Sequence, residues 1–327
     1  MYGFFETVLW PLRWLVEATL FLWHELLTIL GMNPDSGATW VLSILGVVVV
    51  VRSLLIPVTV RQIKSQRRMM DLAPEMRKIQ QKYKGKNDHF SREAMSRETM
   101  ALYKKHGTNP FASCLPILVQ MPIFFSLFFV LRSAAENSPG VGLMTRELTS
   151  SFNRAELFGA PLKMNFEQGW SSGNSVVVIL LGAIMVLMVA SQFFTQLQIV
   201  SKNISDETKN SPMYRQQKIL LYIIPFAFLF SGFVFPLALN IYWFSSNVWT
   251  MIQQAIVINS MPNPGSEAWR KRQERLRAKG KMTDDEREAL KRGEDPKEAA
   301  AQQQKKSGQR QQPMSAKRAK KQGGKKS

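Results

Sequence analysis

The chain has little of the chemistry that enzymes and metal proteins use. Of its 327 residues, one is cysteine (Cys114) and three are histidine. A single cysteine excludes an intramolecular disulfide and any metal site built from several cysteines. The histidines His24, His89 and His106 are far apart in the sequence, which contains no HExxH metal motif and no Walker loop. We therefore expect no catalytic residues, no metal and no cofactor.

Acidic residues are absent from every long apolar run. Without an Asp or Glu in a membrane span, the chain has no residue that could serve an intramembrane aspartyl protease or a carboxylate proton relay. Each run is close to the roughly 20 residues that a membrane-spanning helix needs, which predicts an all-α polytopic membrane protein in spite of a mean hydropathy of −0.12. Four runs are uncharged and the fifth is charged only at Arg52; they cover residues 112–131, 175–200, 219–236, 237–258 and 40–60.

The net charge of +19 is unevenly distributed between these runs. Positive segments alternate with neutral or negative ones, which under the positive-inside rule predicts five spans, an outer N-terminus and a cytoplasmic C-terminus. The start of the chain has neither a lipobox nor a secretory signal, so the expected location is a bacterial plasma membrane. The segment charges are −3 for residues 1–40, +8 for 61–109, 0 for 132–173, +2 for 198–218 and +11 for 262–327.

Residues 1–38 are expected to form an amphipathic helix at the membrane interface. Within residues 3–30 the aromatic side chains suit the level of the lipid headgroups. A sixth span is the alternative, although it would place a segment of charge −3 on the inside. Four polar residues follow helical spacing and should share one face, namely Glu6, Arg13, Glu17 and His24.

Residues 39–261 form the predicted five-span core, which includes a cytoplasmic helical hairpin over 61–109. The expected arms are 60–83 and 90–105, joined by the turn YKGKND and kinked at Pro74. An apolar stripe on the first arm either holds the arms together or meets apolar partners. Its residues are Leu72, Met76, Ile79 and Tyr83, and Met95, Thr99 and Leu102 continue it on the second arm.

Residues 262–327 form a basic tail that is expected to lie in the cytoplasm and to be largely disordered. The tail has almost no apolar residues and cannot bury a core of its own. One short helix is predicted over 269–279, with disorder beyond about residue 300.

Arg52 is the most informative residue, because it interrupts the apolar run VVVVVRSLLIPV at 47–58. Its guanidinium stays charged, and at a bilayer centre it costs roughly 2.5–3.5 kcal/mol. Eight residues separate it from Arg61, a distance of about 12 Å along a helix, which is too far for its side chain to reach the interface readily. With no acid in the spans, we expect neutral groups or water to solvate Arg52 in a polar cavity. The candidate groups are Gln120, Gln192, Gln196, Ser245, Ser246 and Asn247.

Three stretches resemble the YidC-type insertases, the bacterial branch of the Oxa/Albino family. They are LLIPVTVRQIKSQRRM after the intramembrane arginine, ETMALYKKHGTNPFASCLPILVQMPIFFSLFFVL, and FPLALNIYWFSSNVWTMIQQ. The resemblance covers roughly residues 3–261 in order, spacing and topology. It implies five helices around a hydrophilic groove that is open to the cytoplasm and to lipid and closed on the outer face.

By this resemblance the chain is expected to be a membrane protein insertase and chaperone. Arg52 matches the groove arginine, and Gln120, Gln192, Tyr242 and Trp243 match lining positions; Asn247 joins them as a candidate neutral partner. The chain departs from the family at Val48, where many relatives carry a hydroxyl residue. It also lacks the large outer domain and the extra N-terminal span of Gram-negative members.

The expected partners follow from the same resemblance and from the charge. Nascent membrane proteins are the clients, whose acidic tails would meet Arg52, and the Sec translocon is a further expected partner. The tail should bind anionic lipid and the ribosome electrostatically, without sequence-specific nucleic-acid recognition. The alternative function is an anion channel or transporter with Arg52 as its binding site. A channel or transporter would need a path for the anion through the outer leaflet and usually an internal sequence repeat, and the sequence shows no repeat.

Overall fold

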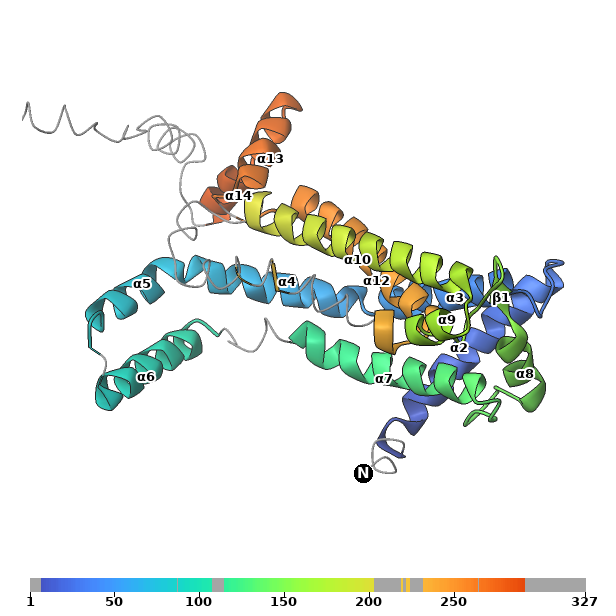
Figure 1. Cartoon of the computed structure of the whole chain (residues 1–327). Coiled ribbons are helices and arrows are strands. Elements are labelled where there is room, and N and C mark those ends of the chain that lie inside the picture. Colours follow the sequence, from blue (N-terminus) through green and yellow to red (C-terminus); the bar gives the residue numbers. More distant parts are fainter. Residues whose placement is uncertain are drawn as a thin grey trace, which may run out of the picture. The chain divides into compact units, whose positions relative to one another are not determined.

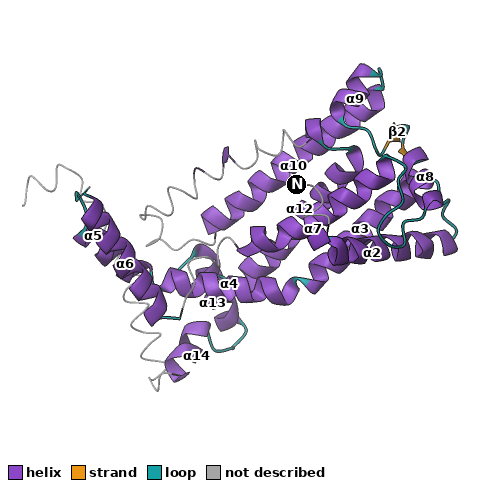
Figure 2. Ribbon diagram, turned by 90° about the horizontal axis from the view of Figure 1, so that it is seen from below, coloured by secondary structure: helices purple, strands orange, loops and turns teal. Residues whose placement is uncertain are grey.

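The computed structural model describes residues 7–86, 88–107, 115–202, 219, 222–223, 232–263 and 265–291. Cys114, Glu6 and most of the apolar run 219–236 lie outside this part of the chain. The described residues are almost entirely helical (Figure 1; Figure 2) and fall into two units, 1–267 and 268–327. The first unit contains α2 (Trp10–Ile29), α3 (Gly37–Leu54), α4 (Ile56–Asp71), α5 (Ala73–Lys82), α6 (His89–Lys105), α7 (Leu115–Ala135), α8 (Arg146–Arg154), α9 (Phe166–Ser171), α10 (Ser175–Lys202) and α12 (Leu237–Ser260).

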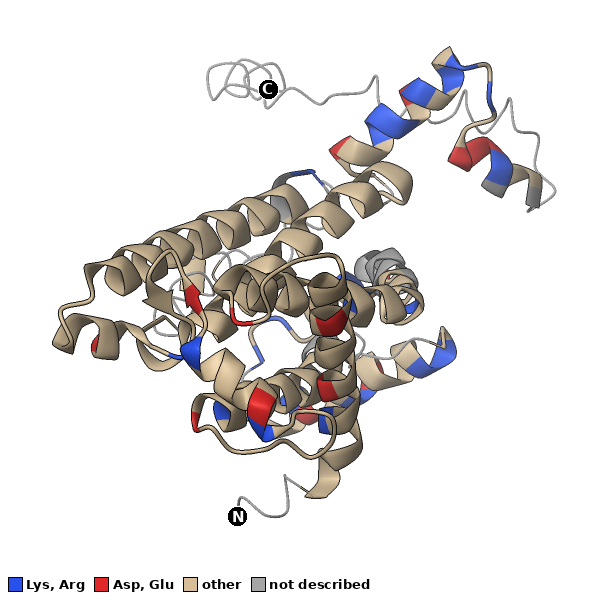
Figure 3. Ribbon diagram, turned by 90° about the vertical axis from the view of Figure 1, so that its right-hand side faces the viewer, with Lys and Arg blue, Asp and Glu red and all other residues tan. Residues whose placement is uncertain are grey.

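The long helices of the first unit confirm the class of an all-helical polytopic membrane protein. Three described stretches are long and apolar enough to cross a membrane, and they match three of the expected runs: 37–63, 118–135 and 175–199. α12 forms a helix where the last run was expected. Figure 3 shows these helices as almost entirely uncharged ribbon. The total of five spans stays a prediction, since the run 219–236 is mostly undescribed.

The long helices pack through one apolar core. α3 contacts α2 and α12, α7 contacts α2, and α10 contacts α12 along its length. Small residues allow these close approaches: a side chain at Gly46 of α3 would collide with the ring of Trp23 of α2, whose Cγ would lie 2.3 Å from the added Cβ. The largest fully buried side chains of this core are Trp40, Ile44, Leu127, Leu131, Phe152, Leu162, Leu181 and Tyr242.

A group of short elements closes the end of the bundle where α7 ends and α10 and α12 begin. β1 (Glu156–Leu157) pairs antiparallel with β2 (Ala160–Pro161) across a turn in which Phe158 and Gly159 both have positive φ. The carbonyls of Leu162 and Met164 then accept hydrogen bonds from the first backbone N–H groups of α12, at 2.9 and 2.8 Å. These bonds satisfy donors that a helix N-terminus otherwise leaves unpaired.

The polar face of α2 is turned into the protein. Arg13, Glu17 and His24 are all buried, which confirms that they share a face, while large apolar residues on the other side of the helix are exposed. A helix with this reversed distribution fits an apolar surrounding better than water. Whether α2 lies at the interface or spans the membrane stays a prediction. The exposed apolar residues are Trp10, Trp14, Leu15, Leu22, Leu26 and Ile29.

Glu17 fastens α2 to the loop between α7 and α8. Its carboxylate accepts the backbone N–H groups of Val141 and Gly142, at 2.8 and 2.7 Å, and its side chain is completely buried. The loop approaches so closely that a Cβ at Gly140 would lie 2.4 Å from Oε1 of Glu17. Hydrogen bonds to a carboxylate are stronger than neutral ones, so this contact fixes the loop over the helix.

His24 anchors the connection between α2 and α3 in a similar way. Its ring lies 4.3 Å from that of Trp40, and its Nε2 lies 3.0 Å from the carbonyl oxygen of Pro34. Ser151 of α8 donates to the same carbonyl and accepts from Nε1 of Trp40. The polar residues of α2 therefore hold the short elements at this end of the bundle.

The predicted helical hairpin is present as α4, α5 and α6, and its cytoplasmic location stays a prediction. The first arm breaks between Asp71 and Ala73, next to Pro74, as expected. Leu72 packs with Leu102 and Tyr103 in a small separate core. Met76 and Ile79 lie against it, so this part of the stripe holds the arms together.

A polar contact near the turn adds to that core. Lys82 and Tyr83 both donate to Glu98, and these bonds lower the pKa of the Glu98 carboxyl. The turn itself runs through Gly85, which has φ +84°, to Asp88, whose side chain caps α6.

The second unit contains two helices, α13 (Glu267–Ala278) and α14 (Asp284–Lys291). α13 confirms the short helix predicted over 269–279, and α14 is an additional helix that the composition did not predict. At the start of α14, the backbone N–H of Thr283 donates to the Glu286 carboxylate and the backbone N–H of Glu286 donates to the Thr283 hydroxyl, and Arg272 pairs with Asp284 at 2.6 Å. The expected disorder beyond about residue 300 lies outside the described residues.

The Glu17 contact can be tested by replacing one oxygen. In Glu17→Gln the side-chain amide nitrogen replaces one of the two oxygens, and the backbone N–H that this oxygen accepted then has no acceptor. This loss should lower the free energy of unfolding by about 1–3 kcal/mol. The measurement is thermal or denaturant unfolding of the purified protein in detergent. Glu25→Gln, on the same helix with a half-exposed side chain, is the matched control. Equal stabilities of the two variants would contradict a structural role for Glu17.

Candidate functional site

Arg52 lies in the last turn of α3 and is bound by a neutral side chain. Its Nε donates to Oγ of Ser246 at 3.1 Å, and its Nη2 donates to the same oxygen. Ser246 is one of the neutral groups that the sequence offered as partners. Nη1 has no hydrogen-bond partner among the described residues. The Arg52 side chain is half-buried, so the guanidinium is held by α12 and stays partly exposed.

Tyr242 and Ser246 are one helical turn apart on α12 and extend this polar contact to a third helix. Both side chains are buried, and the Tyr242 hydroxyl accepts from Nε2 of Gln120 on α7 at 2.9 Å. Residues four apart on a helix lie on the same face, so α12 presents one polar strip to both neighbours. Hydrogen bonds thus link α3, α7 and α12 through neutral side chains of α7 and α12.

An aromatic cluster adjoins the polar strip. The ring of Trp243 stacks on Phe124 of α7, with centroids 4.8 Å apart and an interplanar angle of 3°. Phe235 meets the same indole edge-on at 5.1 Å. Phe124 was not predicted from the sequence, although it lies one turn after Gln120 and so shares its face. Val48, one turn before Arg52, is buried and adds an apolar surface.

Among the described residues, the remaining predicted lining residues form no hydrogen bond with Arg52. Gln192 is half-buried on α10. Asn247 has its amide nitrogen buried without a partner among the described residues. Ser245 donates to the carbonyl of Ile241 in its own helix. Of the predicted set, the structure joins Arg52 with Ser246 and Gln120 with Tyr242, whereas roles for Gln192 and Asn247 stay predictions.

One stretch matches a catalytic motif by its letters alone. Residues 169–173 read GWSSG, which fits the GxSxG pattern of hydrolases. That pattern needs a serine on a sharp strand-to-helix turn with a histidine as its partner. Ser171 is instead the last residue of α9 and donates to the carbonyl of Gln168, while His24 and His106 contact other groups. Among the described residues, no group of three or more metal-ligating side chains is close enough to hold a metal ion.

The chain is similar to characterised membrane proteins over most of its length. Residues 31–264 match the family model described as 60Kd inner membrane protein. The membrane protein insertase YidC of Tropheryma whipplei (strain Twist) is 40% identical over 295 residues, which are 88% of this chain and 95% of the relative. The same-named protein of Bifidobacterium longum (strain NCC 2705) is 35% identical over 312 residues, 92% of each chain.

A solved structure is also similar, with weaker agreement. It is the "Active YidC insertase crystal structure with the first transmembrane domain resolved". The match has a TM-score of 0.43 and 23% identity, and it covers 77% of this chain and 46% of the solved one. This chain thus spans about half the length of that protein.

A double-mutant cycle can measure the link between α7 and α12. Gln120→Ala and Tyr242→Phe should each destabilise the protein, and the pair should show a coupling energy of about 0.5–1.5 kcal/mol, because either change removes the same hydrogen bond. Unfolding of the four proteins in one detergent gives the value. Strict additivity of the two changes would contradict the contact.

Proposed function

The chain belongs to the 60Kd inner membrane protein family, and from this premise we propose that it inserts client proteins into the membrane through a positively charged groove beside Arg52. As a family member with long apolar helices, the chain is a bacterial membrane protein. The observation that carries the proposal is a charged guanidinium, among uncharged helices, whose partner in the described part of the chain is the hydroxyl of Ser246. An intramembrane charge of this kind marks a functional site by default.

The proposed mechanism follows from the partial exposure of Arg52 and from its single hydroxyl partner among the described residues. A nascent span with a short acidic tail enters the groove from the cytoplasm, and the tail meets the positive charge of Arg52 partway across. This contact lowers the cost of moving polar groups through hydrocarbon. The apolar segment then leaves sideways into lipid, where burying its surface contributes about 25 cal/mol per Å².

The membrane potential supplies a second driving force. Each acidic charge that crosses from inside to outside gains about 2.3 kcal/mol per 100 mV. Insertion of this kind needs no nucleotide and no covalent step, which agrees with the expectation that the chain is not an enzyme. Under the proposed topology, the N-terminus lies outside and α5, α6 and the tail lie in the cytoplasm.

The cytoplasmic parts suit transient contact with clients and ribosomes. Phe90 and Met100 are exposed on α6, next to basic side chains, and offer apolar contact to an emerging segment. The basic tail suits ribosomal RNA and anionic lipid through phosphate contacts. Action beside the Sec translocon is proposed from the family resemblance alone.

Substitution of Arg52 tests the electrostatic step. Arg52→Glu should reduce insertion of a single-span client with an acidic tail several-fold in reconstituted liposomes, because the charge that meets the tail is reversed. Arg52→Lys should keep partial activity, since the charge remains without the fork of donors. The readout is the protease-protected fraction of the client.

Two controls separate this effect from misfolding. Arg61→Glu makes the same change of charge at an exposed position of α4, and a client whose tail acids are replaced by Asn or Gln should respond little to Arg52→Glu. Normal insertion of the acidic client by Arg52→Glu would overturn the proposed mechanism. Anion flux through the empty protein would instead favour the channel alternative.

Truncation after Met261 tests the role of the tail. Removal of 20 basic and nine acidic residues should lower co-sedimentation with ribosomes at low salt, with a difference that fades as salt rises. The first unit lacks only its last few residues and should still insert clients. Unchanged ribosome binding at low salt would assign that contact to another part of the chain, such as α5 and α6.

A further inference from the structure

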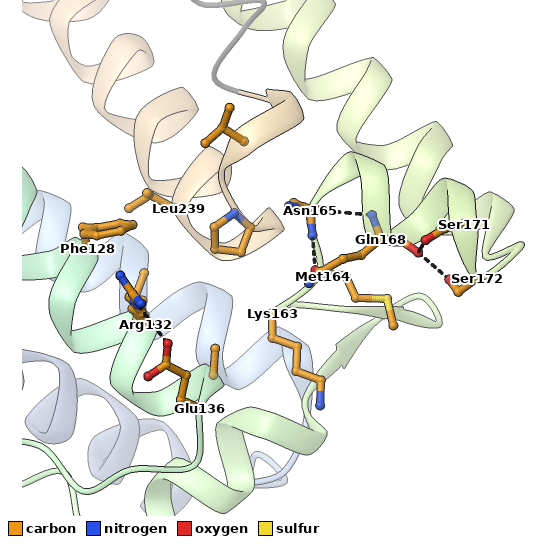
Figure 4. Close-up of a pocket in the computed structure, with 14 residues that line it drawn as sticks. Phe128, Arg132, Glu136, Lys163, Met164, Asn165, Gln168, Ser171, Ser172 and Leu239 are labelled. Atoms are coloured by element: carbon orange, nitrogen blue, oxygen red, sulfur yellow. Dashed lines mark hydrogen bonds and ion pairs between the residues drawn. The ribbon is translucent and has the colours of Figure 1, made fainter.

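A cavity of about 780 Å³ lies at the end of the bundle away from the hairpin, and Arg52 does not line it. Its walls come from the last turns of α7, the segment 163–165, α9 and the start of α12. Figure 4 shows the side chains of α7 entering from one side and those of α9 from another. The size is that of a pocket for a small ligand or a lipid headgroup.

The cavity has an apolar side and a polar side. Phe128 and Leu131 of α7 and Leu239 of α12 form the apolar side, together with Val234, which is 65% exposed. The polar side carries amide and hydroxyl groups from Asn165, Gln168, Ser171 and Ser172. Asn165 and Gln168 also cap α9 through two reciprocal hydrogen bonds, which hold this side in place.

The charged residues of the lining are two cations and one acid. Arg132 donates to Glu136 one turn later on α7 at 2.9 Å. Lys163 donates to the amide oxygen of Asn153 at 2.5 Å. Because an amide is neutral, that bond fixes the lysine without cancelling its charge. The lining therefore carries a net charge of +1 and favours an anionic group.

The position of the cavity indicates that the anionic group belongs to a membrane lipid rather than to a soluble compound. It lies where α7 ends and α10 and α12 begin, which are the ends of membrane-spanning helices, and its apolar side continues to the exposed Val234 and Phe233. Trp170 of α9, 72% exposed, is typical of the level of the headgroups. Acyl chains can reach such a cavity from the membrane, whereas a soluble anion gains nothing from its apolar side.

We propose that this cavity binds one anionic phospholipid, with its phosphate near Lys163 and Arg132, its glycerol headgroup against α9, and its acyl chains along Phe128, Leu131 and Val234. Basic side chains near a membrane surface attract anionic headgroups. The site is separate from Arg52 and does not depend on the proposed insertase activity. A bound lipid here would join α7, α9 and α12 at the end of the bundle that the short elements close.

Photocrosslinking with the full chain in liposomes can test the site. The probe is a phosphatidylglycerol with a diazirine on an acyl chain, and mass spectrometry maps the crosslinked residues. We expect crosslinks on residues 128–136 and on the segment 232–239. Loss of one basic contact, Lys163→Ala, should lower them about fivefold, which corresponds to about 1 kcal/mol per basic residue.

Two further variants keep the test independent of folding. Ser171→Trp fills the cavity from an exposed position while both cations remain, and it should lower the crosslinks similarly. Arg146→Ala removes an exposed cation from α8, outside the lining, and should leave them unchanged. Unfolding measurements on each variant exclude a general loss of structure.

Competitors identify the ligand. Excess unlabelled phosphatidylglycerol should displace the probe, whereas phosphatidylcholine and glycerol 3-phosphate should not. Equal competition by phosphatidylcholine would overturn the role of the charges, and competition by glycerol 3-phosphate would show a site for free phosphate compounds instead. Absence of crosslinks at the cavity in the unmodified protein would overturn the proposal.

Discussion

The need to satisfy the permanent charge of Arg52 between apolar helices governs the arrangement of α3, α7 and α12. A guanidinium keeps its charge, and a bilayer offers it no water in the hydrocarbon. The Ser246 hydroxyl accepts hydrogen bonds from the guanidinium, which requires α12 to pack against α3. The Gln120–Tyr242 bond and the stacking of Phe124 on Trp243 hold α12 against α7 at the same level. The packing of α7 against α12 therefore keeps Ser246 within hydrogen-bond distance of Arg52 and fixes the position of the guanidinium.

Glu17 and Arg52 are two charged side chains of the helical unit that differ in how completely they are hydrogen-bonded. Glu17 is wholly buried and both of its oxygens accept backbone N–H groups, so no further ligand is needed. Half-buried Arg52 donates from two nitrogens to a single hydroxyl oxygen, and Nη1 has no hydrogen-bond partner within the described part of the chain. A fully satisfied buried charge stabilises a structure, whereas a partly satisfied one has capacity left for binding. This difference in hydrogen bonding, rather than burial alone, separates the structural charge from the candidate functional one.

The sequence was sufficient for features that depend on local spacing. Long apolar runs predicted the spans around α3, α7 and α10, and Pro74 predicted the break in the hairpin. Features that depend on contacts distant in the sequence were not predictable: the partners of Glu17 are backbone groups 124 and 125 residues away, which no side-chain pattern marks. The charge argument narrowed the partner of Arg52 to six neutral residues, and only the packing of α12 selected Ser246 among them.

The two ends of the described bundle differ in how firmly they are held. At one end, Glu17, His24 and the carbonyls of Leu162 and Met164 tie loops to helices through buried hydrogen bonds. At the other end, α5 and α6 share a small core around Leu72, and their polar contacts at Lys82 and between Glu75 and His106 are partly exposed. Segments with few buried contacts open most easily, and moving elements come from them. The buried hydrogen bonds at the first end hold the long helices in register, whereas the few buried contacts between α5 and α6 leave the hairpin freer to change its position.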